Sequence, residues 1–395
     1  MDVAYLMRSD YAFNKKLLAL LGLWPTTRSK FRVVLFYLYY VSYLLLQITW
    51  FFTLECDFTC VMNVLPTVLT TASVLLKYVF HHKYMTTVHA LYMMLDLDWN
   101  SFKNDKQSIE ILRRYATMAH VLSVAAMSLL CLIVIVVMTL SFSMLSILHM
   151  PKENCSRFWQ RPFALKQLEK TTSVYNPSFI LCLVTQCTSS MIWVAIDLTN
   201  FAFLEHVCAL FKIVSCHLKR TTNEYVMKLP QYDETNIYTK IIFAVCVHTR
   251  ATEFLQIMWD SFEMHYFWTV FCGTAAMSMA FVNLYTSLQA KEDGRAIILI
   301  FYNIMSFSCY TVLVTFFGQR LIDHSSDVFY ETYNSYWYRI PLKAQKMYLM
   351  ILLRSIKSCS FSMGHVFVSS LKGLCTVTRL RFLNMSKRTS EQSAH

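Results

Sequence analysis

Long apolar blocks separated by short polar stretches dominate the pattern of hydrophobic positions along this chain. A helix needs about 20 apolar residues to cross about 30 Å of hydrocarbon. The last block is weakly hydropathic and contains Lys372, Arg379 and Arg381. In chain order, the blocks are 33–52, 59–80, 121–148, 178–203, 266–288, 296–317 and 360–383. The pattern predicts an all-α integral membrane protein with seven transmembrane helices.

Composition strengthens this prediction. The 395 residues are 56% hydrophobic and only 15% charged, with a mean hydropathy of +0.40, whereas soluble domains carry about 25% charged residues. Six glycines and seven prolines exclude collagen-like and linker-rich chains, which need far more of both. The net charge of +12 lies between the apolar blocks, as expected for topology-setting loops. Nucleic acid is therefore not expected as a partner.

Lysine and arginine are distributed unequally between the two sets of loops. The loops on the side of the N-terminus hold 23 of these residues and the loops on the other side hold 9. Because cytoplasmic loops carry the excess of positive charge, the N-terminus is predicted in the cytosol and the C-terminus outside, the reverse of a G-protein-coupled receptor. Asn154 begins an Asn-Cys-Ser glycosylation signal in a predicted external loop, where such an acceptor must lie.

The cytosolic segments have helical patterns of their own. Leu204, Val207 and Leu210 begin an amphipathic pattern that continues the fourth span, Ile241, Ile242 and Phe254 belong to a second, and Pro341 opens a third. These patterns predict a packed cytosolic layer and a subunit interface. The predicted organisation is a cytosolic N-terminal segment (1–32), transmembrane helices 1–4 (33–203), cytosolic helical extensions (204–265), transmembrane helices 5–6 (266–317), a cytosolic loop and helix (318–359), transmembrane helix 7 (360–384) and an external tail (385–395).

Motifs for enzymatic chemistry are absent. The sequence contains no phosphate-binding GxxxxGK[ST], no HExxH, no GxSxG and no paired-cysteine metal spacing, so neither an enzyme, a cofactor nor a metal site is predicted. Ionisable residues within membrane segments are candidates for function. For Lys77 we expect the side chain to extend to the cytosolic interface. Asp197, near the inner boundary of its span, is expected to form an interfacial pair instead of a transport site.

The outer halves of spans two, three, four and six combine apolar bulk with a few hydroxyl and amide groups. A cavity lined in this way holds a small apolar molecule and orients it with one or two hydrogen bonds. Ordinary helix packing accounts for the same residues, so the pattern alone leaves both interpretations open. The candidate ligand-binding residues are Leu65, Val68, Ser141, Phe142, Phe179, Gln186, Tyr302 and Asn303.

A specific resemblance lies in the C-terminal third. From Cys309 to Gly364 the chain reads CYTVLVTFFGQRLIDHSSDVFYETYNSYWYRIPLKAQKMYLMILLRSIKSCSFSMG. The order and spacing of its aromatic, glycine, proline and arginine positions resemble the insect odorant receptor family. The matching residues are Tyr310, Gly318, Ser325 or Ser326, Tyr333, Trp337, Tyr338, Pro341, Arg354 and Gly364.

The resemblance implies a subunit that binds a small volatile odorant and gates a non-selective cation channel, assembled as a tetramer with a shared olfactory co-receptor. It also implies a place in the plasma membrane of an olfactory neuron dendrite, an odorant cavity in the outer halves of spans two, three, four and six, and subunit contacts in the cytosolic layer. The pore would follow span seven. The span-seven residues named by this resemblance are Gly364, Lys372, Thr376, Arg379, Leu380 and Leu383.

The end of the chain departs from the family pattern. Lys372 stands where relatives usually have an acidic residue, and Arg379 and Arg381 fall in the usual small-and-aromatic ending. A basic ring facing the pore would oppose cation flow. Either these side chains face a neighbouring subunit or water, or the co-receptor mainly forms the pore, or this terminus is an unusual variant. The alternative functions are a G-protein-coupled receptor, a gustatory-type receptor channel and a transporter.

Overall fold

The computed structural model describes residues 3–24, 30–53, 58–146, 175–227, 234–289, 294–363 and 367–368. The described residues are almost entirely helical, which confirms the all-α prediction. The elements are α1 (Val3–Leu20), α2 (Lys30–Thr53), α3 (Phe58–Lys83), α4 (Met85–Ser101), α5 (Lys106–Ser146), α7 (Tyr175–Met227), α8 (Glu234–Gln289), α9 (Gly294–Tyr333), the 3-10 turn Trp337–Arg339, α10 (Leu342–Ser355), β1 (Ser362–Met363) and β2 (Phe367–Val368).

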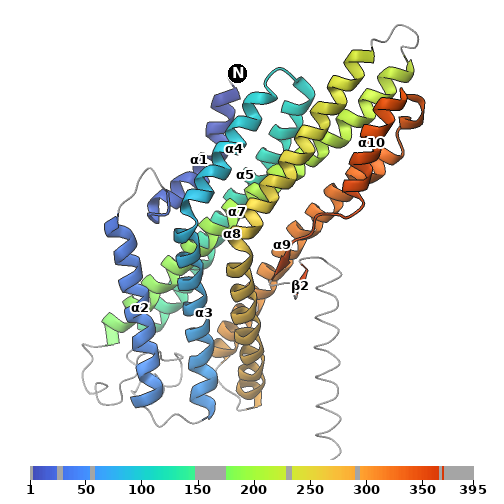
Figure 1. Ribbon diagram of the computed structural model, residues 1–395. Helices are drawn as coiled ribbons and strands as arrows, with labels where there is room; N and C mark the ends of the chain where they lie inside the picture. The colour runs from blue at the N-terminus through green and yellow to red at the C-terminus, as the bar shows by residue number, and fades with distance from the viewer. Residues whose placement is uncertain are drawn as a thin grey trace, which may run out of the picture.

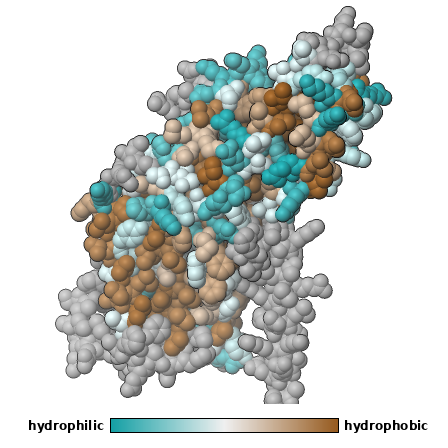
Figure 2. All heavy atoms as spheres, viewed as in Figure 1, coloured by the Kyte–Doolittle hydropathy of each residue, from teal (hydrophilic) through white to brown (hydrophobic). Residues whose placement is uncertain are grey.

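The helices form an elongated bundle (Figure 1). The C-terminal end of α2 and the N-terminal end of α3 lie at one end, while α1, α4 and α10 lie towards the other. Figure 2 shows hydrophobic side chains gathered around α2 and α3, and mixed polar side chains over the opposite end. We call these the membrane end and the polar end.

Four helices in the described part of the chain are long and apolar enough to cross a membrane, in the segments Lys30–Thr49, Val64–Lys83, Val184–Met227 and Thr235–Gln289. Five of the first six predicted spans fall within α2, α3, α7, α8 and α9, and the third coincides with α5 up to Ser146, where the described residues of that span end. The seventh was expected to be helical from residue 360. Instead, Ser362 pairs with Val368 and Met363 with Phe367 in a short antiparallel ladder; the rest of that span lies outside the described residues.

Several helices extend beyond the membrane end without a break. With 53 and 56 residues, α7 and α8 are each roughly 80 Å long at 1.5 Å per residue. The predicted continuation of span four into a second helical layer is therefore confirmed. The segment 81–120, interpreted from the sequence as a loop, holds α4 and the beginning of α5. Buried Val88, Leu91 and Leu95 have helical spacing, a signal that sequence analysis passed over.

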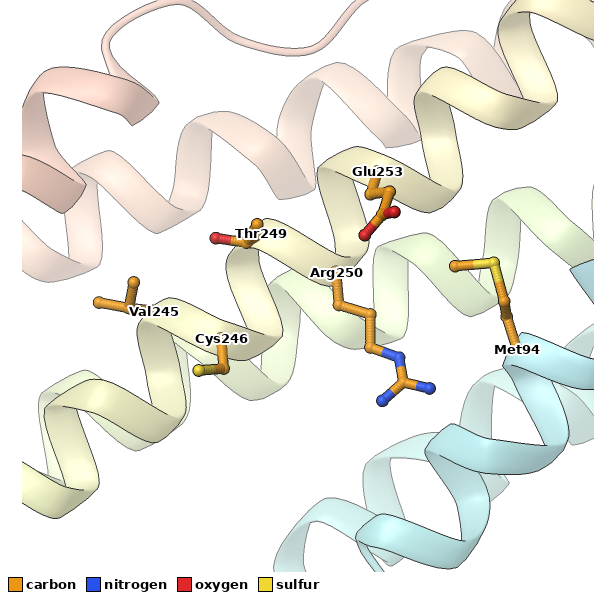
Figure 3. A pocket seen from close by; sticks show the side chains of 6 residues that line it. All are labelled: Met94, Val245, Cys246, Thr249, Arg250 and Glu253. Carbon is orange, nitrogen blue, oxygen red and sulfur yellow. The ribbon is translucent and has the colours of Figure 1, made fainter.

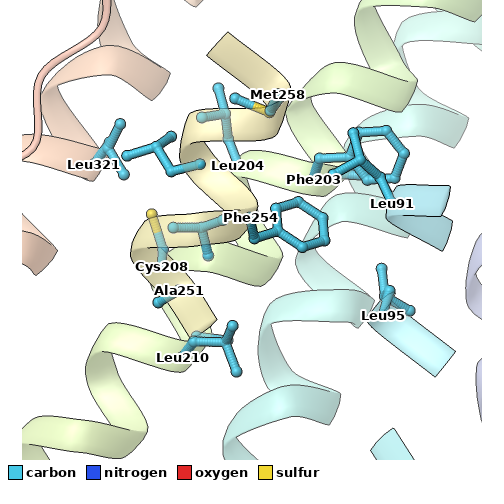
Figure 4. Close-up of a cluster of buried hydrophobic side chains, with 14 of the residues drawn as sticks. Leu91, Leu95, Phe203, Leu204, Cys208, Leu210, Ala251, Phe254, Met258 and Leu321 are labelled. Carbon is cyan, nitrogen blue, oxygen red and sulfur yellow. The ribbon is translucent and has the colours of Figure 1, made fainter. Parts of the chain in front are cut away.

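The central element is α7. In an apolar 18-residue stretch within its segment Val184–Met227, 83% of the residues are buried, against 22% for the corresponding stretch of α2 within Lys30–Thr49. At the polar end, side chains from α4, α7, α8 and α9 close around Phe203, Leu204 and Phe254 (Figure 4).

Of the positions on α8 that the sequence predicted to be apolar contacts, Ile241 is buried but Ile242 is 51% exposed. The prediction for Ile242 was wrong because the helix turns its face by 100° per residue.

At the polar end, the local sequence explains where α1 ends and where α10 begins. After α1, Gly22 has a positive φ of 74°, and the Leu23 amide donates to the Leu18 carbonyl at 2.9 Å. This is a Schellman-type ending, which favours glycine. Pro341 directly precedes α10, as its sequence position predicted, and Tyr348 of α10 donates a hydrogen bond to the carbonyl of Leu218 on α7 at 2.7 Å.

Candidate functional site

The predicted ligand-binding residues lie on α7 and on three helices that pack against it. α3, α5 and α9 each pack against α7. Leu65 and Val68 on α3 are half-buried, whereas Gln186 on α7 and Asn303 on α9 are exposed on the single chain. Four further predicted residues, whose side chains lie outside the described set, are Ser141 and Phe142 on α5, Phe179 on α7 and Tyr302 on α9. The cavity itself stays a prediction.

A buried ion pair joins α3 to α7. Lys77 Nζ lies 2.6 Å from both carboxylate oxygens of Asp197, and their side chains are 0% and 8% exposed. The expectation that Lys77 extends to the aqueous interface was therefore wrong. Its partner lies 120 positions further along the chain, so spacing within α3 could not reveal the pair, although Asp197 was expected to pair.

Two aromatic rings complete the surroundings of the ammonium group. Lys77 Nζ lies 3.8 Å from the ring centroid of Trp193 and 5.5 Å from that of Tyr310. The two rings meet edge to face, with centroids 4.9 Å apart. Aromatic faces attract a cation, most strongly when it is desolvated. Tyr310, the first tyrosine of the C-terminal motif, is thus brought to the ion pair from α9.

Further polar side chains surround this pair from α3, α7 and α8. Asn200 donates a hydrogen bond to the Tyr266 hydroxyl at 3.1 Å, and the ring of His265 lies 4.2 Å from that of Tyr266, centroid to centroid. His81, one turn after Lys77, stacks on Phe262 at 6.0 Å. The result is a buried polar cluster within helices that are otherwise packed through apolar side chains.

Additional ionic contacts follow α7 towards the polar end. Arg320 of α9 binds Glu205 through two hydrogen bonds, of 2.7 and 2.8 Å. His206 Nε2 lies 2.9 Å from an oxygen of Asp98 on α4, and Arg250 of α8 approaches the other oxygen at 2.5 Å. α7 therefore carries polar contacts to α3, α4, α8 and α9 in turn, which fix their relative register.

The same pattern continues near the end of α7. His217 Nε2 lies 2.8 Å from Asp105 Oδ2, and Ser108 donates to the same carboxylate at 2.5 Å. Burial alone would raise the pKa of Asp105, but the hydrogen bonds from Ser108 and His217 outweigh it and lower the pKa below its ordinary value. Asp105 directly precedes α5, so this carboxylate also contacts the helix N-terminus through the Gln107 amide, at 3.2 Å.

Some motif residues of the C-terminal third make contacts inside the chain, and others are exposed on its surface. Ser325, 4% exposed, accepts a hydrogen bond from the Cys359 amide at 3.0 Å and so ties α9 to the segment after α10. Ser326 instead donates to the Asp323 carbonyl of its own helix. Gly318 is buried, Trp337 is half-buried, and Arg354 lies in the last turn of α10. Tyr333 and Tyr338 are 59% and 57% exposed.

One open pocket lies at the polar end between α4 and α8 (Figure 3). It encloses about 440 Å³ and is lined by Met94, Val245, Cys246, Thr249, Arg250 and Glu253. Arg250 extends from α8 towards α4 (Figure 3), where it reaches Asp98. This pocket is remote from the predicted cavity residues.

The remaining predicted residues lie outside the described part of the chain. They are Asn154 in the predicted external loop and Gly364, Lys372, Thr376, Arg379, Leu380 and Leu383 of span seven. The glycosylation site and the pore assignment therefore stay predictions.

The sequence profile of the family described as 7tm Odorant receptor matches residues 57–382. This chain belongs to that odorant receptor family. Because the family consists of receptors, the prediction that the chain is not an enzyme is confirmed. No curated protein has a significant sequence match to the chain.

Two solved structures of the insect olfactory receptor OR5 from Machilis hrabei have a similar fold. The structure in complex with eugenol has a TM-score of 0.71 and 13% identity, and the match covers 97% of this chain and 98% of that chain. The structure whose description names no ligand has a TM-score of 0.65, with the same identity and coverage. The likeness supports the membrane fold over nearly the whole chain.

Proposed function

We propose that this chain is the odorant-binding subunit of an odorant-gated, non-selective cation channel. The observation that carries the proposal is the match to the odorant receptor family over residues 57–382. The similar receptor solved with eugenol supports a small volatile molecule as the ligand. By this proposal the molecule lies among the membrane-end helices, near Val68, Gln186, Tyr302 and Asn303, and the pore follows span seven.

The proposal includes a cytosolic N-terminus, an external C-terminus and a place in the plasma membrane of olfactory neuron dendrites. The orientation is supported by the excess of lysine and arginine in the loops of the N-terminal side, 23 against 9. A tag at the N-terminus is therefore expected to bind antibody only after permeabilisation, whereas a C-terminal tag binds on intact cells. The opposite result would favour the G-protein-coupled alternative.

Assembly with a co-receptor is proposed through the outward face of α10. Leu342, Met350, Leu353 and Ile356 are 62–71% exposed at the polar end, while Tyr348 and Ile351 hold the opposite face against the chain's own core. Apolar patches of this kind at an aqueous surface mark interaction sites. A tetramer with the co-receptor would cover this face.

The experiment that tests the function is current recording in cells that express the chain with and without the olfactory co-receptor. An odour panel is expected to evoke cation current only when both subunits are present. Met350→Asp is expected to reduce co-precipitation with the co-receptor, and Met93→Asp, at a 55% exposed position of α4, is the matched control. Absence of any odorant-evoked current with both subunits at the surface would overturn the proposed function.

The cavity is tested by Tyr302→Ala. We expect this substitution to change or abolish the odorant response and to leave surface expression intact. Unchanged dose-response curves across a broad odour panel would remove Tyr302 from the site.

A further inference from the structure

The ion pair of Lys77 and Asp197 lies beneath the predicted odorant cavity on three of its helices. Lys77 follows Val68 by nine residues, Asp197 follows Gln186 by eleven, and Tyr310 follows Asn303 by seven. At 1.5 Å per residue these offsets are about 14, 16 and 10 Å. A ligand in the outer halves would not contact the pair, yet movement of any of these three helices would reach it.

Stability alone does not explain an ion pair in this place. Well-packed apolar side chains usually replace a buried pair without loss, because desolvation offsets the Coulomb attraction. An ion pair differs from apolar packing because its contacts depend strictly on distance and orientation. Nζ lies 2.6 Å from both oxygens, so a shift of about 1 Å between α3 and α7 breaks contacts that apolar packing would tolerate. The best-attested use of such a pair is to fix register or to act in a switch.

The helices that meet here are built to transmit movement. α7 runs without interruption from Tyr175 to Met227, so displacement at its membrane end carries Asp197 and the contacts of Glu205 and His206 with it. α3 ends at Lys83, just after the pair, and Tyr84 leaves helical geometry with φ −97° and ψ 19°. Lys77 therefore belongs to a helix that ends six residues after it, while Asp197 belongs to one that continues into the polar end.

The surroundings also supply hydrogen-bonding alternatives for an opened pair. Both ring nitrogens of His81 and Nε2 of His265 have no hydrogen-bond partner among the described residues, although these side chains belong to residues only 1% and 2% exposed. Buried polar atoms without partners are rare and mark sites of strain or function. His81 lies one turn after Lys77 on α3, so its unpartnered nitrogens are polar atoms close to the pair.

We propose that the Lys77–Asp197 pair, with Trp193 and Tyr310 around it, locks α7 against α3 in the closed channel, and that odorant binding opens the channel by releasing this lock. Lys77 and Asp197 are positioning residues that do not touch the odorant. A ligand shifts such an equilibrium only through its different affinity for the two states. Weakening the lock therefore favours the open state before any odorant binds. The inference rests on the proposed function.

The test is the double variant Lys77→Met/Asp197→Leu, which removes both charges and leaves neither one buried alone. Co-expressed with the co-receptor, it is expected to raise the current without odorant and to lower the half-maximal odorant concentration. Each change is expected to be at least about fivefold, the lower end of typical allosteric couplings. The factor should be the same for odorants of different size. Lys219→Met/Glu331→Leu, which removes an exposed pair between α7 and α9, is the matched control and should change neither quantity.

The outcomes separate the lock from the function. The lock alone is overturned by the following pair of results. The wild-type channel gives odorant-evoked current, and the double variant, expressed at the surface, has the same basal current and half-maximal odorant concentration as the wild type. A shift that differs from odorant to odorant would place the residues in the cavity and also overturn it, as would a decrease in basal current. No odorant current from the wild-type channel overturns the proposed function itself.

A second variant covers failure of the first to reach the cell surface. Trp193→Leu keeps both charges and removes the ring that lies 3.8 Å from the ammonium. It is expected to shift basal current and half-maximal concentration in the same direction by a smaller factor. Unchanged values for Trp193→Leu at normal surface expression would overturn the lock.

Discussion

The membrane end and the polar end of this molecule are held together by different interactions. At the polar end, Glu205, Asp98 and Asp105 each bind a cationic or histidine partner on another helix, around an apolar core. At the membrane end, α2 exposes Leu38 and Leu45, at 65% and 58%. Lipid is as apolar as leucine, so an exposed leucine there costs nothing, whereas water at the polar end requires a covered core.

The comparison teaches that equal exposure has different meaning at the two ends. An exposed leucine of α2 faces hydrocarbon, but an exposed leucine of α10 faces water or a partner. A buried charge also differs. Glu205 at the polar end has a bidentate arginine, while Asp197 has a single lysine and aromatic rings. The following predictions test this contrast, from the largest expected effect to the smallest.

Removing one partner of the buried polar-end pair is expected to have the largest effect. Glu205→Ala leaves Arg320 partly buried without its carboxylate, and breaking a buried pair costs about 3–5 kcal/mol. Glu331→Ala removes an equally short contact, Lys219 to Glu331 at 2.7 Å, whose side chains are 55% and 35% exposed; such pairs contribute at most about 1 kcal/mol. Apparent unfolding temperatures in detergent compare the two. Equal losses would contradict the contrast.

A charge placed on the lipid-facing surface is expected to have the second-largest effect. Leu45→Arg places a cation near the centre of the first span, at a cost of about 2.5–3.5 kcal/mol. Leu97→Arg, at a position of α4 that is 57% exposed against 58% for Leu45, faces water and is expected to be neutral. The measurement is the fraction of tagged protein that reaches the cell surface. If Leu97→Arg were as harmful as Leu45→Arg, the surface around α4 would not be aqueous.

The sequence predicted much of this division, for identifiable reasons. Six spans were recognisable because an apolar run of about 20 residues is typical of a membrane-crossing helix, and Pro341 marked the start of α10. The helix α4 was missed although Val88, Leu91 and Leu95 have helical spacing, because the segment between two spans was interpreted as a loop. The pair of Lys77 and Asp197 was missed because pairing across 120 positions depends on how the helices pack. The cavity cannot be read from composition for the same reason, since its shape depends on three-dimensional packing.

Close packing between α8 and α9 at the membrane end predicts an intermediate effect. A Cβ atom added at Gly273 would overlap the ring of Phe307, so Gly273→Ala requires the ring or the helices to move. Overpacking of this kind costs about 1–3 kcal/mol. Phe307→Leu in the same chain is expected to recover part of the loss. Apparent unfolding temperatures of the two single variants and the double variant measure the recovery; strictly additive losses would show that Phe307 is not the obstacle.

The smallest expected effect is a pH dependence at the polar end, from His324 on α9. Burial lowers the pKa of His324, and the positive charge of Arg320 lowers it further, against the hydrogen bond to the Arg320 carbonyl that raises it. The unfolded chain therefore binds a proton near pH 6.5 while the folded chain resists it. Stability is fully present above this pH and decreases as the pH falls from about 6.5 towards the lower folded-state pKa.

The neighbouring Tyr115 does not contribute to this pH dependence. Its hydroxyl lies 2.6 Å from His324 Nε2, and burial raises the pKa of Tyr115 to about 12, so the phenol stays protonated throughout and does not titrate in this window. His324→Gln removes the titrating group and keeps a side chain that can hydrogen-bond. Unfolding temperatures between about pH 5 and 7.5 are expected to fall more steeply with acid for the wild type than for His324→Gln. Parallel curves would show that protonation at another site governs the acid sensitivity of the polar end.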